Sequence, residues 1–508
     1  MSVRTGKQYV EGLRDDRRIY INGEIVRDVT KYPPLQGVIR QLAALYDRQH
    51  EQGFKEVLTY RSSDPAEPGS GEPVSTSFLI PTSLEGVERR VRGERVRAEL
   101  TNGMMGRLPD YMNAYVADLA AIRDLLGRNE RAFGDNMWKY YELCRDNDLA
   151  LTHTLVDPQI DRSKGIEAQE GLRIVKETSA GLVLTGARML STLAPISDEI
   201  LVAPYMPRRQ NEAEYAIVFA LPVATPGLTF ICREPYDAGR SPYDRPLSSR
   251  YDEGDAIAVF KDALVPWERV FGARDVDTYN LISPSIPGFL LLQAAIRGVV
   301  KLRFMTGVAG LVAKAVGRSE MPRYQEMLGA LVANVELAEG LLTSIAHEIW
   351  NNVRQLGAAK TARKGAPTAS FIPGVGSMYG VPGKTLIGLT TIRIFLPQAH
   401  TQAVDTVRML GSSGLIMTPT EKDFRNPELA EVLSQYLRGA SIAAEERVRI
   451  MKLAWDAIGE QFGSRSLLYE WFFAGDPINN RILYYPTETN TNCTAMAQAF
   501  LDSMERSD

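Results

Sequence analysis

The chain is 508 residues long, which is too much for one compact core, so we expect two or three packed units. Its apolar fraction of 44% and charged fraction of 24% are ordinary for a globular protein. The formal net charge of −4 and the pI near 5.9 disfavour a nucleic-acid-binding protein, whose contact surface would be basic.

The first region, residues 1–150, has the periodicity of helices. In residues 37–51 the apolar residues Val38 and Leu42 recur at helical spacing, and residues 111–127 repeat the pattern. We therefore expect an N-terminal helical domain over residues 1–150.

The middle region, residues 151–280, changes to short β-rich runs that are separated by turn residues. Residues 182–190 and 215–223 are examples of such runs. Strands of this length and spacing predict a small β barrel or sandwich. The long polar segment 235–254 interrupts them, and a loop of that length in a compact domain is more often functional than idle.

The last region, residues 281–508, returns to the helical period. Its clearest predicted helix covers residues 323–353, where apolar residues step by three or four positions and form one face. The stripe consists of Met327, Leu331, Val335, Ala338, Leu342, Ile345 and Ile349. Three more long helices complete a predicted bundle that associates with other subunits. The Gly/Pro-rich stretch 365–383 is expected to be a surface excursion, and its GxG does not follow a strand as a Rossmann motif would.

Targeting segments and metal-binding patterns are not found in the sequence. The start has no signal-peptide core and no run of about 18 apolar residues occurs, so we expect a cytoplasmic protein without a membrane span. Cys144, Cys232 and Cys493 have neither disulfide-framework nor metal-site spacing. No two of the 4 histidines lie within helical or hairpin reach, so no metal site is predicted. The chemistry is expected to depend on an organic cofactor, carboxylates or isolated histidines.

A glycine-rich turn at residues 102–111 leads into a predicted helix. Pro109 suits the first helical position, so Arg107 and Tyr111 could project from a fixed helix entry. The alternative is a capping turn in which Asp110 accepts hydrogen bonds from helix amides and Arg107 is solvated. Residue chemistry alone leaves both interpretations open.

The second candidate is His153, which lies at the junction of the helical and β regions. A domain junction is a common place for a ligand pocket. The flanking threonines and the polar turn that follows suit a binding site as well as a structural histidine. Ser191 and Thr192 end a predicted strand, where their hydroxyls would face a cofactor or cap a turn.

Six segments together resemble the 4-hydroxyphenylacetate 3-monooxygenase oxygenase family, which includes chlorophenol monooxygenases. Several long motifs in collinear order are far more specific than any single one, and they span most of the chain. They are GMMGRLPDYMNAYV (residues 103–116), LTHTLVDPQIDR (151–162), LPVATPGLTFICRE (221–234), DRPLSSRYDEGDAIAVFKDALVPWERVF (244–271), GSSGLI (411–416) and LYEWFFAGDP (468–477).

The resemblance implies an α+β fold like that of the acyl-CoA dehydrogenases. Its parts would be an N-terminal helical domain, a middle β barrel or sandwich and a C-terminal long-helix bundle that builds a homotetramer. It also implies the oxygenase component of a two-component enzyme, to which a separate, diffusing flavin reductase supplies FADH2. The FADH2 would react with O2 to a C4a-hydroperoxyflavin that hydroxylates a phenol at the ortho position.

The resemblance also implies site residues, carried over motif by motif. Residues matching the family's phenol contacts are Arg107, Tyr111 and His153, and residues matching its flavin contacts are Gln159, Asp161, Arg162, Thr192, Asp476 and Pro477. The phenol contacts make chemical sense, because a phenol with a pKa near 10 is mostly protonated at neutral pH. A guanidinium favours phenolate character, and a histidine can donate to the oxygen or accept its proton.

Three places depart from the 4-hydroxyphenylacetate enzymes of the family: residues 190–196, residues 207–215 and Asn479. They fall where a substrate tail and flavin phosphates would be bound. We therefore expect another phenol, such as a tyrosine-derived or chlorinated one, free or tethered to a carrier protein as in enediyne pathways. Residues 235–254 and 205–214 are candidate lids that would exclude water.

Four alternatives stay open. A halophenol-dehalogenating monooxygenase would share the site. A 4-hydroxybutyryl-CoA dehydratase would share the fold but needs three cysteines and a histidine for an iron–sulfur cluster, which Cys144, Cys232 and Cys493 do not fit. An acyl-CoA dehydrogenase would need a catalytic carboxylate, for which the sequence offers no clear candidate. A catalytically silent scaffold is disfavoured by the set Arg107, Tyr111 and His153.

Overall fold

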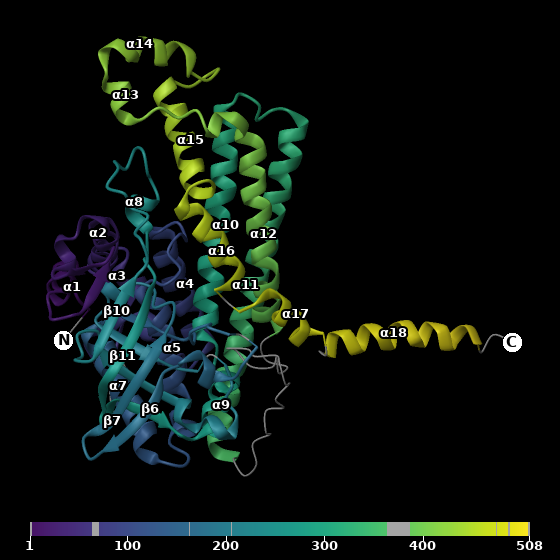
Figure 1. Cartoon of the computed structure of the whole chain (residues 1–508). Helices are drawn as coiled ribbons and strands as arrows, with labels where there is room; N and C mark the ends of the chain where they lie inside the picture. Colours follow the sequence, from purple (N-terminus) through teal and green to yellow (C-terminus); the bar gives the residue numbers. More distant parts are fainter. Residues whose placement is uncertain are drawn as a thin grey trace.

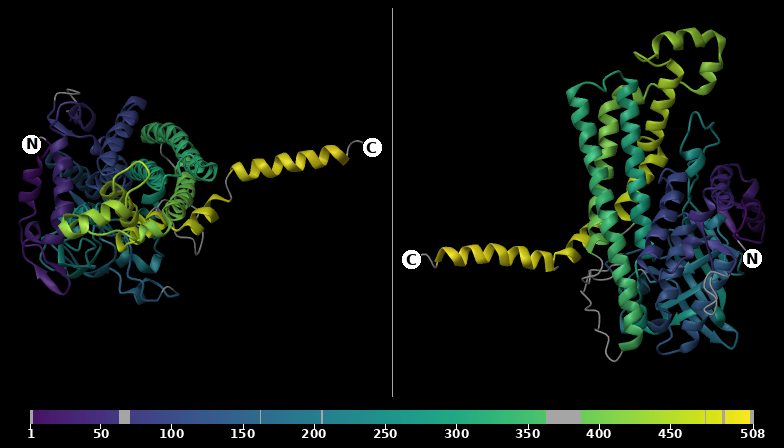
Figure 2. Two further views of the ribbon diagram at one scale, coloured as in Figure 1. Left: turned by 90° about the horizontal axis from the view of Figure 1, so that it is seen from above. Right: turned by 180° about the vertical axis from the view of Figure 1, so that it is seen from behind.

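The computed structural model describes residues 3–62, 71–161, 163–204, 206–362, 387–473, 475–485 and 488–505. The N-terminal helices and the β-sheets form one side of the body, and long helices form the other (Figure 1). The last helix, α18 (Glu488–Glu505), extends away from this body in every view (Figures 1 and 2). The stretch 365–383 lies outside the described residues.

Helices dominate the N-terminal region, as the periodicity predicted. Thr5 and Gln8 form a capping box at the start of α1, and the Ser83 hydroxyl accepts a hydrogen bond at the start of α4. Pro109 begins α5, where a missing N–H costs nothing. The helices here are α1 (Gly6–Gly12), α2 (Pro33–Arg48), α3 (Lys55–Leu58), α4 (Leu84–Leu100), α5 (Pro109–Ala121), α6 (Arg123–Leu126) and α7 (Arg131–Asn147).

Two sheets make up the β part. The larger has the strand order β2-β1-β10-β11-β7-β6 and the smaller β12-β9-β8-β5, while β3 and β4 form a separate pair. The pairs β1/β10 and β5/β8 are parallel. The strands are β1 (Ile19–Ile21), β2 (Glu24–Val26), β3 (Thr59–Arg61), β4 (Pro73–Ser75), β5 (Leu151–His153), β6 (Arg173–Thr178), β7 (Gly181–Arg188), β8 (Glu199–Val202), β9 (Ile217–Pro222), β10 (Leu228–Cys232), β11 (Ala256–Pro266) and β12 (Val270–Ala273).

The strands β1 and β2 correct the expectation of a helical N-terminal region. They lie in residues 19–26 and extend the larger sheet beyond β10. Strands of three residues carry too little alternation for a periodicity to reveal them. The N-terminal region is therefore joined to the middle region through a shared sheet.

The long helix α10 (Phe289–Ala315) is the centre of the bundle, and α11 (Pro322–Ala362) and α12 (Ile387–Gly411) pack against it. The predicted stripe on α11 is confirmed, because Leu331, Ala338, Leu342, Ile345 and Ile349 are buried. The remaining helices are α8 (Ser248–Tyr251), α9 (Val276–Ser285), α13 (Glu421–Arg425), α14 (Pro427–Tyr436), α15 (Ala444–Ile458), α16 (Gln461–Phe472) and α17 (Pro477–Tyr484).

One part of α11 has the length and composition of a membrane span. Residues 322–354 meet this test, although no such run was expected. In the structure the helix instead packs within the bundle, and its Glu339 accepts a hydrogen bond of 2.8 Å from Arg95 of α4. In the single chain 22% of the most apolar window of this helix is buried, and its length and composition alone are weak evidence for a membrane span.

The polar segment 235–254 forms a strap between the sheet and the bundle. The backbone N–H groups of Leu247 and Ser248 donate to the Asp456 carboxylate of α15, at 2.8 and 2.9 Å. Lys452 of α15 forms an ion pair of 2.9 Å with Asp244. Both ends of these contacts are buried, so residues 244–248 connect the two parts, and a role of the segment 235–254 as a lid stays a prediction.

Candidate active site

The turn that carries Arg107 is held between α10 and α16 by close backbone approach. Gly103 has a φ of +65°, and a Cβ there would lie 2.4 Å from the backbone nitrogen of Lys301. A Cβ at Gly106 would lie 2.0 Å from the Tyr469 hydroxyl. Neither position tolerates a side chain, which explains the glycines of this motif.

The two interpretations of this turn are now distinguished. The residue that caps α5 is Leu108, which makes no side-chain cap hydrogen bond. Asp110 is buried and accepts a hydrogen bond of 3.2 Å from Gln293 of α10. Arg107 is also buried and not solvated. The capping alternative is therefore wrong, and the turn presents Arg107 to the protein interior.

Arg107 lies among aromatic rings. Its guanidinium carbon is 3.9 Å from the centre of the Tyr111 ring and 5.2 Å from that of Tyr469. Its Nη2 donates to the Phe473 carbonyl at 3.3 Å, and its backbone N–H donates to the Glu253 carboxylate at 2.5 Å. The charge is thus held in one position by elements from distant parts of the chain.

His153 is the last residue of β5 and lies beside the same cluster. Its ring centre is 5.9 Å from that of Tyr111. Both ring nitrogens are buried and lack a hydrogen-bond partner among the described residues. Burial, together with the nearby charge of Arg107, holds the pKa of His153 well below its usual value, against a smaller opposite effect of Asp255. The ring is therefore neutral and can donate from one nitrogen and accept at the other.

The three predicted phenol contacts therefore come together, and the structure adds residues that sequence reasoning missed. Tyr469 and Phe473 of α16 stack on each other with ring centres 5.0 Å apart. The Tyr469 hydroxyl is buried without a partner among the described residues, like the nitrogens of His153. Buried polar atoms are rarely left unpaired, so this group of atoms is typical of a ligand site. The motif LYEWFFAGDP was the only sequence signal for α16.

A second group of hydroxyls lies in the loop between β7 and η4 (Ala194–Ile196). Leu190 and Leu193 have φ values of +63° and +64°, which are rare for bulky residues and typical of functional loops. Between them, the Ser191 hydroxyl is buried without a partner among the described residues. The Thr192 hydroxyl donates to Asp255 at 2.9 Å, and the Thr192 carbonyl accepts from Thr152 at 2.6 Å.

The predicted flavin contacts after His153 lie on a turn that continues from β5. Gln159 is exposed. The Asp161 carboxylate accepts hydrogen bonds from the Ser163 backbone and hydroxyl, at 3.0 and 2.6 Å, which lower its pKa. Arg162 lies outside the described residues. A surface turn with these polar groups has the chemistry to bind a phosphate or ribose, and the residues stay predictions.

The other predicted flavin contacts, Asp476 and Pro477, begin α17. The Asp476 carboxylate accepts from the backbone N–H groups of Ile478 and Asn479, at 3.3 and 3.1 Å. Asp476 therefore caps this helix, three residues after the carbonyl that binds Arg107. This places the end of α16 and the start of α17 at the edge of the Arg107 cluster.

Family models match nearly the whole chain. The model described as the N-terminal part of 4-hydroxyphenylacetate 3-hydroxylase matches residues 5–272, and that of its C-terminal part matches residues 288–502. The chain belongs to this hydroxylase family.

Relatives and a solved structure agree with this membership. A 4-hydroxyphenylacetate 3-monooxygenase oxygenase component from Geobacillus is 35% identical, over 96% of this chain and 94% of its own. A Streptomyces globisporus monooxygenase that acts on a carrier-bound 3-amino-3-(3-chloro-4-hydroxyphenyl)propanoyl group is 32% identical, over 94% and 86%. The crystal structure of an oxygenase component complexed with FAD and 4-hydroxyphenylacetate is similar with a TM-score of 0.85 and 35% identity, over 99% of both chains.

With 4-hydroxybutyryl-CoA dehydratase, one of the alternatives from the sequence, the protein shares only the fold. A 4-hydroxybutyryl-CoA dehydratase structure has a TM-score of 0.82 but 18% identity, over 99% of this chain and 95% of its own. The cysteines Cys144, Cys232 and Cys493 lie in α7, β10 and α18. In the part of the chain that the structure describes, no three potential ligands gather as a metal site. The predicted α+β fold is confirmed by the two sheets and the helices of the structure and by its similarity to the oxygenase component with 35% identity.

Behind the Arg107 cluster, the hydroxylase buries a group of charges. The Glu470 carboxylate pairs with Arg297 at 2.5 Å and with Lys301 at 2.7 Å, and all three side chains are buried. Arg297 in turn lies 4.6 Å below the centre of the Phe473 ring. The Nε2 of His400 donates a hydrogen bond to the Gly298 carbonyl, 3.1 Å away, and burial lowers the pKa of His400 to about 4.

The two buried histidines predict acid sensitivity of the fold. Both have a pKa below the unfolded value of about 6.5, so their stabilising effect is present above pH 6.5 and is lost as the pH falls toward 4. His400→Gln is expected to reduce the slope of unfolding free energy against pH in that window by roughly 1.4 kcal/mol per pH unit. Urea titrations of both proteins at several pH values measure it. An unchanged slope would mean that His400 takes up its proton over the same pH range in the folded and the unfolded protein.

Proposed function

We propose that this protein is the oxygenase component of a two-component monooxygenase that uses reduced FAD and O2 to hydroxylate a phenol next to its hydroxyl group. Membership in the hydroxylase family supports the reaction type. The observation that carries the proposal for this chain is the buried cluster of Arg107, Tyr111 and His153, whose histidine nitrogens lack partners among the described residues.

The cluster suits the chemistry of a phenol. Ring attack by an electrophilic oxygen is easier when the phenol oxygen carries negative charge, and the fixed guanidinium of Arg107 stabilises that charge. Neutral His153 can accept the phenol proton or donate to the oxygen, because no partner among the described residues fixes the tautomer of its ring. Tyr111 lies between the two side chains and orients the ring of the substrate.

When bound, reduced FAD would supply the electrons that activate O2, so that one oxygen atom enters the phenol ring and the other leaves as water. We assign its ring system to the loop with the left-handed leucines, because Ser191 and Thr192 there offer buried hydroxyls. Gln159, Asp161 and Arg162 on one side, and Asp476 and Pro477 on the other, are proposed to bind the rest of the cofactor. The second group is supported by Asp476, which caps α17 three residues after the carbonyl that binds Arg107.

A phenol with a polar or carrier-bound tail is the proposed substrate class. The supporting observation is that residues 207–215, which depart from the 4-hydroxyphenylacetate enzymes, include a short helix, η5 (Gln210–Tyr215), whose start is fixed by a hydrogen bond from the Arg209 N–H to Glu212. Arg208 pairs with Asp157 of the turn after His153 at 2.7 Å. A similar protein from Streptomyces globisporus acts on a carrier-bound chlorinated phenol. Tyr205, in the candidate lid, lies outside the described residues.

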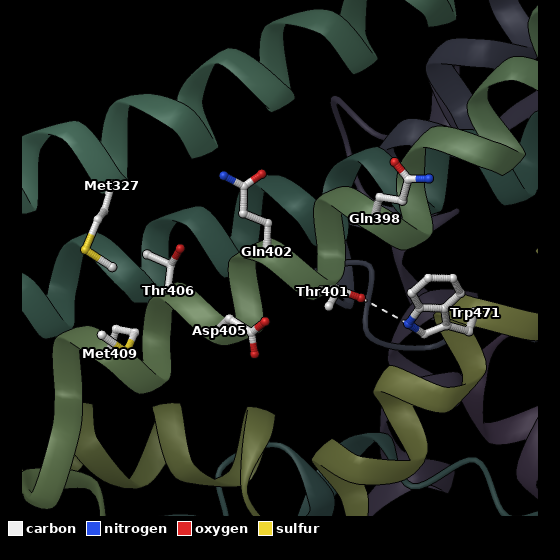
Figure 3. A pocket seen from close by; sticks show the side chains of 8 residues that line it. All are labelled: Met327, Gln398, Thr401, Gln402, Asp405, Thr406, Met409 and Trp471. Carbon is white, nitrogen blue, oxygen red and sulfur yellow. Dashed lines mark hydrogen bonds between the residues drawn. The ribbon is translucent and has the colours of Figure 1, made fainter.

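The protein depends on a separate flavin reductase, and we propose that it forms a homotetramer through its bundle. A hollow of about 420 Å³ on the outer face of the bundle is lined by Met327, Gln398, Thr401, Gln402, Asp405, Thr406, Met409 and Trp471 (Figure 3). Trp471 donates to Thr401 there at 3.0 Å. Met409 in its lining and Phe472, next to Trp471 in the chain, are exposed in the single chain. A second copy would cover them.

The function is tested by single-turnover reactions. The protein is mixed with chemically reduced FAD, ¹⁸O2 and a phenol, in a panel that pairs free and carrier-tethered tyrosine derivatives, chlorinated phenols and 4-hydroxyphenylacetate. We expect at least one catechol that contains one ¹⁸O atom. His153→Ala is the matched variant: it should still consume reduced FAD but lose the product. Absence of labelled product across the panel, with folded protein, would refute the proposal.

A further inference from the structure

The hydroxyl of Thr192 donates its hydrogen bond to a neighbouring carboxylate. Thr192 Oγ1 lies 2.9 Å from Asp255 Oδ1. Asp255 forms ion pairs with Arg465 at 2.7 Å and with Arg233 at 2.9 Å, and its side chain is 15% exposed. The two guanidinium groups hold the pKa of Asp255 far below its usual value, despite burial. An ionised carboxylate can only accept hydrogen bonds, so the threonine is the donor.

The backbone fixes this pair as firmly as the side chains do. The Ser191 N–H donates to the Ala256 carbonyl at 2.8 Å, and the Leu193 N–H donates to the Glu253 carbonyl at 3.2 Å. The loop with Thr192 therefore lies along the start of β11, with Asp255 directly beside it. The left-handed leucines on both sides of the hydroxyls keep the loop in this register.

We propose that Asp255 restricts the Thr192 hydroxyl to accepting hydrogen bonds from a ligand, so that the flavin site selects reduced over oxidised FAD. The inference rests on the proposed function, in which Thr192 faces the flavin ring. A hydroxyl has one proton, and the proton of Thr192 points to Asp255, so only lone pairs remain for a ligand. Nitrogen N5 of reduced flavin carries a hydrogen and can donate to them. The same nitrogen in oxidised flavin has only a lone pair and is repelled.

This selectivity suits an enzyme that receives its flavin by diffusion. It must take up the reduced form in the presence of the oxidised form and release the oxidised form after each turnover. The carboxylate gives the site this preference without any residue that changes its own redox state. Asp255 would act as a positioning residue, since it contacts the threonine and is not assigned a contact with the cofactor.

The test is a comparison of two dissociation constants. Anaerobic fluorescence titrations measure the binding of reduced and of oxidised FAD to the full-length protein. Thr192→Val keeps the shape of the side chain and is expected to weaken the binding of reduced FAD about tenfold, as for one lost hydrogen bond in a buried site, with little effect on oxidised FAD. Thr192→Ser is expected to restore the preference. Asp255→Asn places an amide beside the threonine that can donate to its oxygen and so free its proton, and it is expected to tighten the binding of oxidised FAD.

Asp252→Asn is the matched control. Asp252 pairs with the same Arg233, at 2.5 Å, but its hydrogen bonds go to the arginine and to backbone N–H groups. It should leave the ratio of the two constants unchanged. Equal changes for both flavin forms in Thr192→Val, or none, would overturn the inference even if Asp255→Asn fails to fold. Failure of the wild-type protein to bind either form would instead refute the proposed function.

Discussion

Replacing Arg107 with methionine is expected to lower phenol hydroxylation by about two orders of magnitude, while the oxidation of reduced FAD by O2 continues. The guanidinium is the fixed positive charge of the cluster, 3.9 Å from the centre of the Tyr111 ring. Without it, the phenol loses the group that stabilises charge on its oxygen. The measurement is the yield of hydroxylated product per reduced FAD consumed, together with the rate of product formation.

Arg107→Lys separates charge from shape. Lysine keeps the charge but lacks the planar group that lies over Tyr111 and reaches the Phe473 carbonyl, so we expect an intermediate loss. A second readout is the pKa of His153, which NMR can follow. It should rise in Arg107→Met, because the arginine charge helps to lower it. Full hydroxylation activity in Arg107→Met would refute the assignment of Arg107 to the active site.

Glu470→Gln is expected to cost roughly 3–5 kcal/mol of unfolding free energy. The substitution leaves Arg297 and Lys301 buried without the carboxylate that compensates them, at positions 2.5 and 2.7 Å from it. The charges of both cations hold the pKa of Glu470 well below its usual range despite burial, which shows how strongly they are coupled. Urea unfolding followed by circular dichroism measures the change.

Glu339→Gln is the control for this prediction. Glu339 also pairs with an arginine, Arg95, but its side chain is 28% exposed. Pairs in contact with water contribute little, so we expect a loss below about 1 kcal/mol. Similar losses in the two variants would mean that burial does not determine how much the Glu470 ion pairs contribute to the unfolding free energy.

Local patterns in the sequence predicted local structure well. The stripe on α11 and the change from helical to β periodicity near residue 151 depend only on neighbouring residues, and both are confirmed. The strands β1 and β2 were missed because three residues are too few to show alternation. The contact of the segment 235–254 with α15 could not be predicted, because Leu247 and Asp456 are 209 residues apart in the chain.

The candidate site shows the same limit. Arg107, Tyr111 and His153 stand in motifs that can be recognised, and the structure brings them together. Tyr469, Glu253 and Asp255 belong to the site only through contacts across the fold, so no local pattern singled them out. The polarity of the Thr192 hydroxyl depends on Asp255, which is 63 residues away in the chain.

The hydrogen bond from Arg107 to the Phe473 carbonyl joins residues 366 positions apart. A ribosome that adds 5–20 residues per second needs roughly 20–70 s to make that stretch. During this time the helices and sheets of the earlier part can fold, but the Arg107 cluster still lacks Tyr469 and Phe473. We therefore expect the Arg107 cluster to be complete only after synthesis has passed Phe473, so that a chain cut short before α16 would lack part of the proposed phenol site.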